Sequence, residues 1–237
     1  PPTVTVFKIP KTVQEGAVDL VNKWQLVGPA LPDDLMIRII AMGDTAKFEG
    51  MYLGTCKTLT PLMSSKFPEL GMNASHCNEM PWIKTIPFIH LGKQATLVDL
   101  LNRNNSFKPF AEYKSDYVYQ PVPKTVWAQI FVWLVKPGAG IMIMDPYGAA
   151  ISATPEAATP FPHRKGVLFN IQYVNYWFAE PAGAAVPRRD PVHRRHQHGA
   201  EVEAEGVGAV GERGEEGLHA GAGLLVEELD EPHGGEH

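Results

Sequence analysis

The start of the chain shows a strand-like hydrophobic pattern followed by a helical one. Residues 3–9 alternate β-branched and other side chains, which predicts a strand. Thr12 and Glu15 then form a capping-box sequence, in which each side chain can satisfy a backbone donor at a helix start. Apolar residues recur at helical spacing up to the stop at residues 28–29, so a helix is predicted over 13–27.

Strand-like and helical patterns alternate in the middle of the chain. Residues 35–42 and 48–53 predict two strands, which a turn at 43–45 joins as a hairpin. The pair at 60–61, Thr followed by Pro, predicts a helix start, because proline is tolerated in the first helical turn. Residues 94–103 carry leucine and valine at helical spacing and predict a second helix.

From residue 125 onward the pattern favours strands. Residues 126–135 and 141–144 predict a hairpin whose turn, at 137–140, contains two glycines. Residues 166–177 predict a further long strand. Strands therefore follow strands here, while helices are inserted earlier. This order favours an α+β fold in which an antiparallel sheet is covered by helices on one face.

The last quarter of the chain has a different composition from the rest. Residues 179–237 carry 13 acidic and 5 basic side chains and no aromatic residue, whereas the preceding part has a formal charge of +3. So few apolar side chains cannot offset the entropy of ordering a segment of this length. We expect one folded domain over 1–180 and a disordered, low-complexity acidic tail over 181–237. Translation of GC-rich DNA out of frame is an alternative origin for that tail.

Charge and hydropathy exclude two classes of function. The folded part has only a small excess of Lys and Arg, so nucleic acid is not expected as a partner. No apolar run approaches the roughly 20 residues that span a bilayer, so no membrane span is expected. The chain begins at Pro1 without Met or an apolar leader, so we expect a fragment whose targeting signal lies upstream.

Two sequons predict a secreted glycoprotein. The triplets that begin at Asn73 and Asn104 both match the N-glycosylation pattern and lie beside turn-forming residues. Cys56 and Cys77 are the only two cysteines. They either form one disulfide in an oxidising compartment or are two small buried apolar side chains.

Two further motifs are interpreted as having no function. His193, His196 and His198 could bind Zn²⁺, but in a flexible tail this indicates casual affinity, so no metal site is predicted. The glycines of residues 138–140 lack the third glycine of a dinucleotide fingerprint and precede a predicted strand, which favours a simple turn.

Asn170 and Gln172 give the sharpest signal in the chain. Period-two alternation places both amides on one face of the strand predicted at 166–177. A buried amide without a partner costs about 1–3 kcal/mol, so both need hydrogen bonds. They either form a cross-strand amide ladder or a solvated sheet face, or they build a polar wall that orients a ligand in an apolar cleft.

Three sequence blocks together resemble a known family. They are Lys-Ser-Asp-Tyr-Val at 114–118, Asp-Pro-Tyr-Gly at 145–148, and Phe-Pro-His-Arg at 161–164 before the amide-bearing strand. In this order they resemble the berberine bridge enzyme family of FAD-linked plant oxidoreductases, and within it the secreted group 4 grass pollen allergens. The likeness covers about residues 1–180.

The resemblance implies that residues 1–180 are a substrate-binding domain, an antiparallel sheet backed by helices. The FAD-binding domain, which attaches the cofactor covalently, would lie upstream. Gln172 falls where alcohol-oxidising members hold a glutamine, and Asn170 falls where alkaloid-forming members hold a glutamate base. Because an amide cannot take a proton at neutral pH, Gln172 is expected to position a substrate hydroxyl. Asp145 matches a substrate-facing position.

Two functions are therefore expected. The first is the substrate-binding portion of a secreted FAD-dependent oxidoreductase that oxidises a small alcohol or a carbohydrate with O₂ as acceptor, inert without its FAD-holding domain. The second is a non-catalytic secreted pollen glycoprotein that antibodies recognise as an allergen, in which Asn170 and Gln172 are structural.

Overall fold

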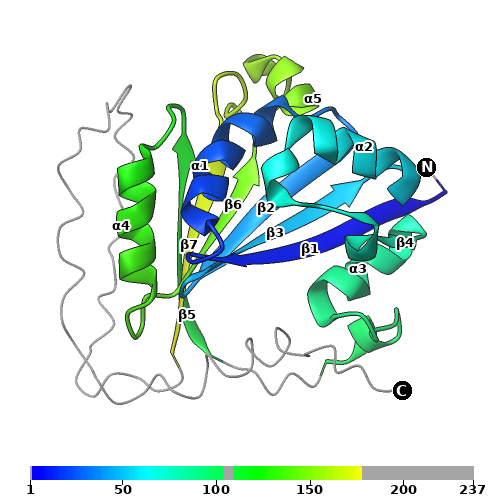
Figure 1. Cartoon of the computed structure of the whole chain (residues 1–237), viewed down its shortest axis with the longest axis horizontal. Helices are drawn as coiled ribbons and strands as arrows, with labels where there is room; N and C mark the ends of the chain where they lie inside the picture. Colours follow the sequence, from blue (N-terminus) through cyan, green and yellow to red (C-terminus); the bar gives the residue numbers. More distant parts are fainter. Residues whose placement is uncertain (1, 104–108, 178–237) are drawn as a thin grey trace. The chain divides into compact units, whose positions relative to one another are not determined.

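A seven-stranded sheet with the order β4-β1-β3-β2-β6-β7-β5 organises the molecule (Figure 1). The computed structural model describes residues 2–103 and 109–177, and those up to Tyr176 form one compact unit. The strands are β1 Val4–Thr12, β2 Leu35–Met42, β3 Thr45–Tyr52, β4 Asn78–Met80, β5 Phe110–Val118, β6 Ile141–Pro146 and β7 Phe169–Trp177. The predicted tail, including the cluster of His193, His196 and His198, lies outside the described residues.

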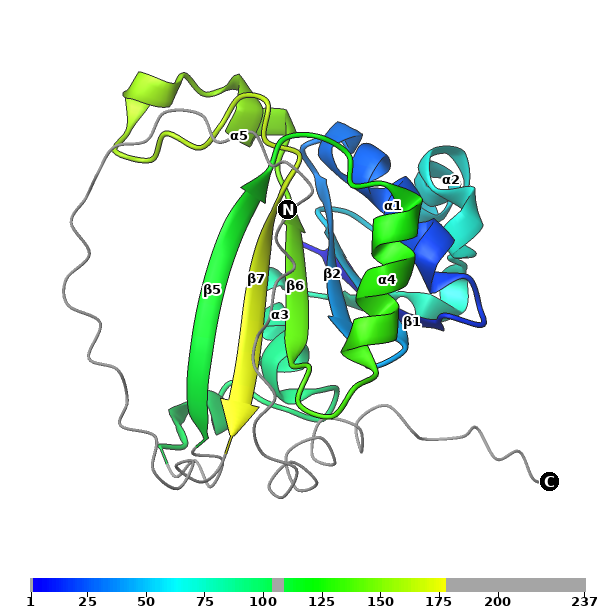
Figure 2. The ribbon, with the colours of Figure 1, turned by 90° about the vertical axis from the view of Figure 1, so that its left-hand side faces the viewer.

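The strand pairing is antiparallel, as predicted. β1 pairs antiparallel with β3 and β4, β2 with β3 and β6, and β6 with β7. Figure 2 shows β5 running beside β7 in the opposite direction. The predicted hairpin of β2 and β3 is confirmed, since Met42 pairs with Thr45 at its turn.

Helices cover one face of this sheet, which confirms the predicted α+β class (Figures 1 and 2). The covering helices are α1 Ala17–Val27, α2 Cys56–Lys66 and α4 Lys124–Leu134. The remaining helices are α3 Trp82–Leu91 and α5 Ala149–Ala153. Single 3₁₀ turns occur at Gly28–Ala30, Pro68–Leu70, Ala74–His76, Asp99–Leu101 and Glu156–Ala158.

The helix-covered face holds the main hydrophobic core. Alternate residues of β2 are buried there, because successive side chains of a strand point to opposite faces. The ring of Phe7 on β1 lies over Gly50 of β3, where an added Cβ would come within 2.1 Å of the ring. Glycine at position 50 therefore makes room for the Phe7 ring in the core.

Helix α1 is fixed to the sheet and to the segment before α4 by two buried polar side chains. Trp24 donates from Nε1 to the carbonyl of Ile37 at 2.7 Å and packs edge-on against Phe169, with ring centroids 5.3 Å apart. Gln25 donates to the carbonyl of Val122 at 2.9 Å and accepts from its N–H at 2.8 Å. These contacts join α1 to β2, to β7 and to the segment before α4.

The strand predicted at 126–135 is wrong, because residues 126–134 lie in helix α4, which ends at Leu134. Trp127, Phe131 and Leu134 are almost fully buried at spacings of four and three residues, which is the helical period. The segment is rich in β-branched and aromatic residues, which favour strands by propensity. Burial of this one helical face against the sheet overrides that preference, and the hairpin predicted around 137–140 does not form.

The helix predicted at 94–103 is also wrong. Within it the structure has only the 3₁₀ turn Asp99–Leu101. The Asp99 carboxylate accepts hydrogen bonds from the Thr96 N–H and hydroxyl, both at 2.7 Å, which favours a local turn. Val98 and Leu101 are each 72% exposed, so no apolar face packs against the sheet to stabilise a longer helix.

Two helices begin at residues other than those predicted. The capping-box contacts of Thr12 and Glu15 form, with the Thr12 N–H donating to Glu15 at 2.9 Å, but they close a turn before α1, which begins at Ala17. Helix α2 begins at Cys56, so Pro61 lies inside the helix instead of at its first turn.

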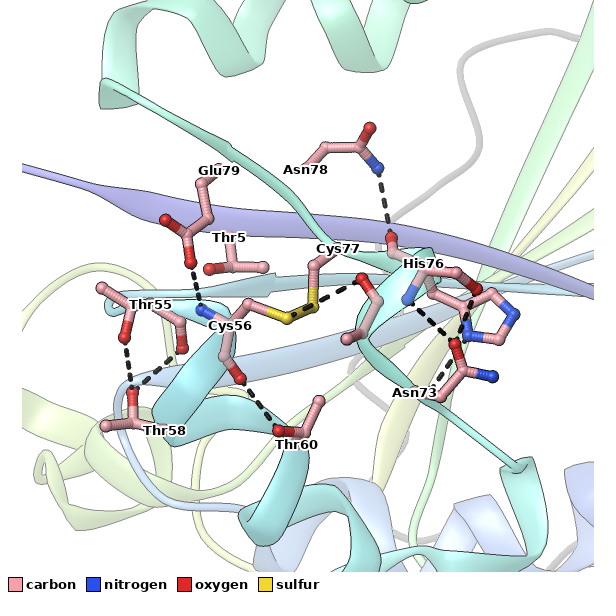
Figure 3. The surroundings of a disulfide bond; sticks show 12 residues. Thr5, Thr55, Cys56, Thr58, Thr60, Asn73, His76, Cys77, Asn78 and Glu79 are labelled. Atoms are coloured by element: carbon pink, nitrogen blue, oxygen red, sulfur yellow. Dashed lines mark hydrogen bonds between the residues drawn. A yellow bond between two sulfur atoms is a disulfide. The ribbon is translucent and has the colours of Figure 1, made fainter.

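A disulfide joins Cys56 at the start of α2 to Cys77 just before β4 (Figure 3). The Cys56 N–H also donates to the Glu79 carboxylate at 2.6 Å, so a hydrogen bond supports the same junction. Of the two alternatives that the sequence left open for these cysteines, the structure contains the bridge.

Candidate functional site

The face of the sheet opposite α1, α2 and α4, called here the open face, carries both predicted amides. Asn170 pairs with Asp145 and Gln172 pairs with Ile143 across β7 and β6. Directly opposed residues in an antiparallel pair point to the same face. The side chains of Asn170, Gln172 and Asp145 therefore lie on the open face, while Ile171 points into the helix-covered core.

Gln172 belongs to a hydrogen-bonded series that crosses three strands. Its Nε2 donates to Oδ2 of Asp145 at 3.2 Å. Oδ1 of Asp145 accepts from Nε and from the terminal nitrogen of Arg38, on β2, at 2.9 and 2.7 Å. Both oxygens of the Asp145 carboxylate are thus already bonded within the protein.

Asn170 is held separately from Gln172. It is 8% exposed, and its Nδ2 donates to the backbone carbonyl of Asp116 on β5 at 3.2 Å. The two amides therefore do not form the cross-strand ladder that was one of the sequence-based alternatives.

A pocket of about 270 Å³ opens beside the two amides. Three elements build it: β7, the strand β5 next to it, and the segment that follows β6. Its lining residues are Tyr113, Lys114, Ser115, Tyr117, Tyr147, Asn170 and Gln172. Asp145 is not among them, so the predicted substrate contact of Asp145 stays a prediction.

Aromatic side chains form one wall of this pocket. The Tyr117 ring stacks on His163 with centroids 4.0 Å apart and meets the Tyr147 ring edge-on at 5.7 Å. Burial raises the pKa of Tyr147, and the neighbouring Tyr117 raises this pKa further. The Tyr147 hydroxyl therefore stays protonated at neutral pH and can both donate and accept hydrogen bonds.

A cluster of three charged side chains lies elsewhere on the open face. Glu49 of β3 lies 3.0 Å from Lys47 and 3.7 Å from Lys8, with its carboxylate side chain 9% exposed. Lys8 also donates to the carbonyl of Ile89, which brings α3 against the β1 end of this face. The Glu49 carboxylate is thus neutralised by its two lysine neighbours.

The residues that the structure describes do not fit a complete FAD. The pocket is below the range of about 300–1,000 Å³ typical even of drug-sized ligands. Within the described ranges, no glycine-rich turn leads into a helix that could hold a pyrophosphate. The same residues contain no group of three metal-ligating side chains. The geometry fits a small polar molecule that contacts amides, tyrosines and Lys114.

Of the two glycosylation candidates, Asn73 lies within the described residues and Asn104 does not. Asn73 lies before the 3₁₀ turn Ala74–His76 (Figure 3). Its Oδ1 accepts from the Ser75 N–H at 2.9 Å and from the Ser75 hydroxyl at 2.6 Å. The side chain is exposed. Asn104 lies outside the described residues, so its glycosylation stays a prediction.

Sequence reasoning identified the two amides but missed much of the pocket. Lys114 and Tyr117 lie in one of the blocks that carry the family resemblance, and Tyr147 lies in another. Tyr113 and Arg38 carried no signal of their own. Their roles depend on β7 lying between β6 and β5, which no local pattern indicates.

No family model matches the chain, but individual proteins do. The berberine bridge enzyme-like protein Cyn d 4 of Cynodon dactylon is 65% identical over 184 residues, which cover 78% of this chain and 35% of Cyn d 4. Tetrahydroberberine oxidase of Berberis wilsoniae is 40% identical over 199 residues, 78% of this chain and 37% of that protein. The chain therefore spans about a third of the length of the curated relatives it matches.

Solved structures show the same fold. The crystal structure of Phl p 4, described as a grass pollen allergen with glucose dehydrogenase activity, matches with a TM-score of 0.74 and 79% identity, covering 79% of this chain and 38% of Phl p 4. BBE-like 28 from Arabidopsis thaliana matches with a TM-score of 0.71 and 37% identity, covering 75% of this chain and 38% of that protein.

Within the described residues, no helix has the length and apolar composition to cross a bilayer.

Proposed function

This chain is a homologue of the berberine bridge enzyme-like proteins, and on that premise we propose that it is the substrate-binding portion of an FAD-dependent oxidoreductase. Its substrate is a small alcohol or a carbohydrate, and O₂ is the electron acceptor. The observation that carries this proposal is the pocket on the open face, which Asn170 and Gln172 line together with three tyrosines. The glucose dehydrogenase activity given for Phl p 4 supports the choice of a carbohydrate.

The lining residues suit binding and orientation of a hydroxyl compound. Amides and tyrosines offer hydrogen-bond donors and acceptors, and aromatic rings offer a flat surface for a sugar ring. None of the lining residues is a carboxylate, and an amide does not remove a proton at neutral pH. In this proposal FAD supplies the redox chemistry. The residues of this chain bind the substrate and hold its hydroxyl in place.

FAD is held by another part of the protein, so the chain alone is catalytically inert. Purified by itself, it should show no flavin absorbance in the visible range and no oxidation of D-glucose. A yellow preparation with bound FAD would contradict this part of the proposal.

A chimaera tests the function directly. The matching 184-residue segment of Cyn d 4 is replaced by the corresponding segment of this chain, since the two are 65% identical there. The expected result is a flavoprotein that consumes O₂ with D-glucose or another small alcohol. Gln172→Leu in the chimaera should abolish turnover while flavin content and melting temperature stay near the parent values.

A matched control is Leu26→Ala, at a side chain that is 54% exposed on the helix-covered side of the sheet. This variant should keep full turnover. If Gln172→Leu retains parental turnover on every sugar and alcohol that the chimaera oxidises, the amide has no place in substrate binding and the proposal fails.

A second function is favoured by the names of the relatives, which include pollen allergens. In it the chain is a secreted, non-catalytic glycoprotein that antibodies recognise, with Asn73 and Asn104 glycosylated. Replacing both Asn170 and Gln172 by Leu in the chimaera separates the two functions. If the amides bind substrate, the double variant should lose turnover with little loss of stability. If their role is purely structural, the double variant should be destabilised first.

A further inference from the structure

We infer that Arg38 and Asp145 fix the direction of the Gln172 carboxamide, so that its carbonyl oxygen faces the pocket and its NH₂ group does not. Arg38 and Asp145 are then positioning residues, which make this wall of the pocket a hydrogen-bond acceptor. The inference rests on the proposed function only for the ligand that uses the pocket; the orientation itself follows from the hydrogen bonds of the described residues.

The direction follows from which groups can donate. A guanidinium has only donors, and an ionised carboxylate has only acceptors. Arg38 donates twice to Oδ1 of Asp145, at 2.9 and 2.7 Å, and so holds that carboxylate in place. Oδ2 of Asp145 can then only accept from the NH₂ group of Gln172, which lies 3.2 Å away. The hydrogen-bonding chemistry of Arg38 and Asp145 thus determines that the NH₂ group of Gln172, and not its carbonyl oxygen, faces Asp145.

The carbonyl end of Gln172 has no partner of its own. Among the described residues, the Gln172 side chain forms its hydrogen bond through Nε2 and none through Oε1, and Gln172 lines the pocket. Asn170 repeats the pattern, because its NH₂ group donates to the Asp116 carbonyl, which cannot donate back. Each amide therefore uses one N–H of its NH₂ group within the protein. The pocket wall at Gln172 is suited to a ligand that brings a donor, such as a hydroxyl group.

One isosteric substitution should reverse this polarity. In Asp145→Asn, the new carboxamide must turn its oxygen toward Arg38, because Arg38 cannot accept a hydrogen bond. Its NH₂ group then points at Gln172 and can donate only to Oε1. The Gln172 carboxamide rotates to meet it, and its own NH₂ group turns toward the pocket. The pocket wall changes from acceptor to donor with almost no change in side-chain volume.

The experiment is NMR spectroscopy of the ¹⁵N-labelled 237-residue chain, with the side-chain NH₂ signals of Gln172 identified by their absence in Gln172→Met. In the parent, hydrogen exchange of these protons should be about tenfold slower, or more, than at the exposed Gln14, since a hydrogen bond to a carboxylate protects them. In Asp145→Asn the protection should be lost. Glu49→Gln is the matched control, because it removes the same charge from the same face without touching Gln172.

The outcomes separate this inference from the proposed function. Exchange at Gln172 as fast as at Gln14 in the parent would overturn the inference, as would unchanged protection in a folded Asp145→Asn. If Asp145→Asn does not fold, the parent measurement alone decides. A titration with D-glucose then addresses the pocket: protected Gln172 protons that do not respond to the sugar would contradict the carbohydrate assignment and leave the orientation of the amide intact.

Discussion

Replacing Cys56 and Cys77 together by serine removes the covalent link between the start of α2 and the segment before β4. The bridge closes a loop with a sequence separation of 21 residues. In the chain-entropy model, a loop of this length lowers the free energy of folding by about 3 kcal/mol through its effect on the unfolded chain. In a domain of this size, that loss corresponds to a fall in melting temperature of roughly 6–12 °C.

Part of the local structure should survive the replacement. The Cys56 N–H still donates to the Glu79 carboxylate, and β4 still pairs with β1. The double variant is therefore expected to fold, with a lower midpoint in urea and an unchanged far-UV spectrum. Equilibrium unfolding in urea, followed by Trp fluorescence, measures the difference.

The chain has only two cysteines, which makes the control simple. A thiol reductant should lower the stability of the parent to that of the double variant and should leave the double variant unaffected. Two titratable thiols in the unreduced, denatured parent would refute the reasoning, because the bridge would then be absent. Equal stability of parent and double variant would refute the entropic estimate.

Three further predictions follow from the described contacts. Trp127→Ala should destabilise the domain by about 3–5 kcal/mol in urea, because this side chain is 1% exposed, whereas Val126→Ala, at a side chain 42% exposed, should change stability little. Burial and the neighbouring Tyr113 raise the pKa of Tyr176 from 10.0 to about 12. The folded state therefore holds the Tyr176 proton more tightly than the unfolded state does. The contribution of this group to stability is complete below pH 10 and is lost as the pH rises to about 12. Phenolate absorbance should show that the titration of Tyr176 moves to lower pH in Tyr113→Phe. Expressed through a secretory pathway, the chain should lose one glycan by mass in Asn73→Gln, and equally in Ser75→Ala.

The sequence predicted best those elements whose burial pattern is local. In β2, buried and partly exposed residues alternate along the strand, and the β2–β3 hairpin was predicted within a few residues. In α4 the apolar residues are of types that favour strands but recur at helical spacing, so composition favoured a strand where a helix forms. At 94–103 the helical spacing was present, but no sheet surface lies against Val98 or Leu101 to bury it.

The candidate site could be predicted only in part, because it depends on strand order. The alternation of side chains between the two faces of a strand correctly predicted that Asn170 and Gln172 lie on one face of β7. Their hydrogen-bond partners come from β6 and β5, and β5 lies more than 50 residues earlier in the chain. Which strand lies beside β7 is set by the packing of the whole sheet, so the tyrosine wall from β5 was not accessible from the sequence.

The hydrogen bonds of the two amides distinguish between the alternatives that the sequence left open. In a cross-strand ladder Asn170 and Gln172 would pair with other carboxamides, and on a solvated face they would be largely exposed. Asn170 is instead 8% exposed and bonded to a backbone carbonyl, while Gln172 is bonded to Asp145. Burial of Asn170 without that bond would cost about 1–3 kcal/mol. A fold that needed only stability could hold apolar residues at these two positions of β7, so the carboxamides are better explained by the pocket that they line.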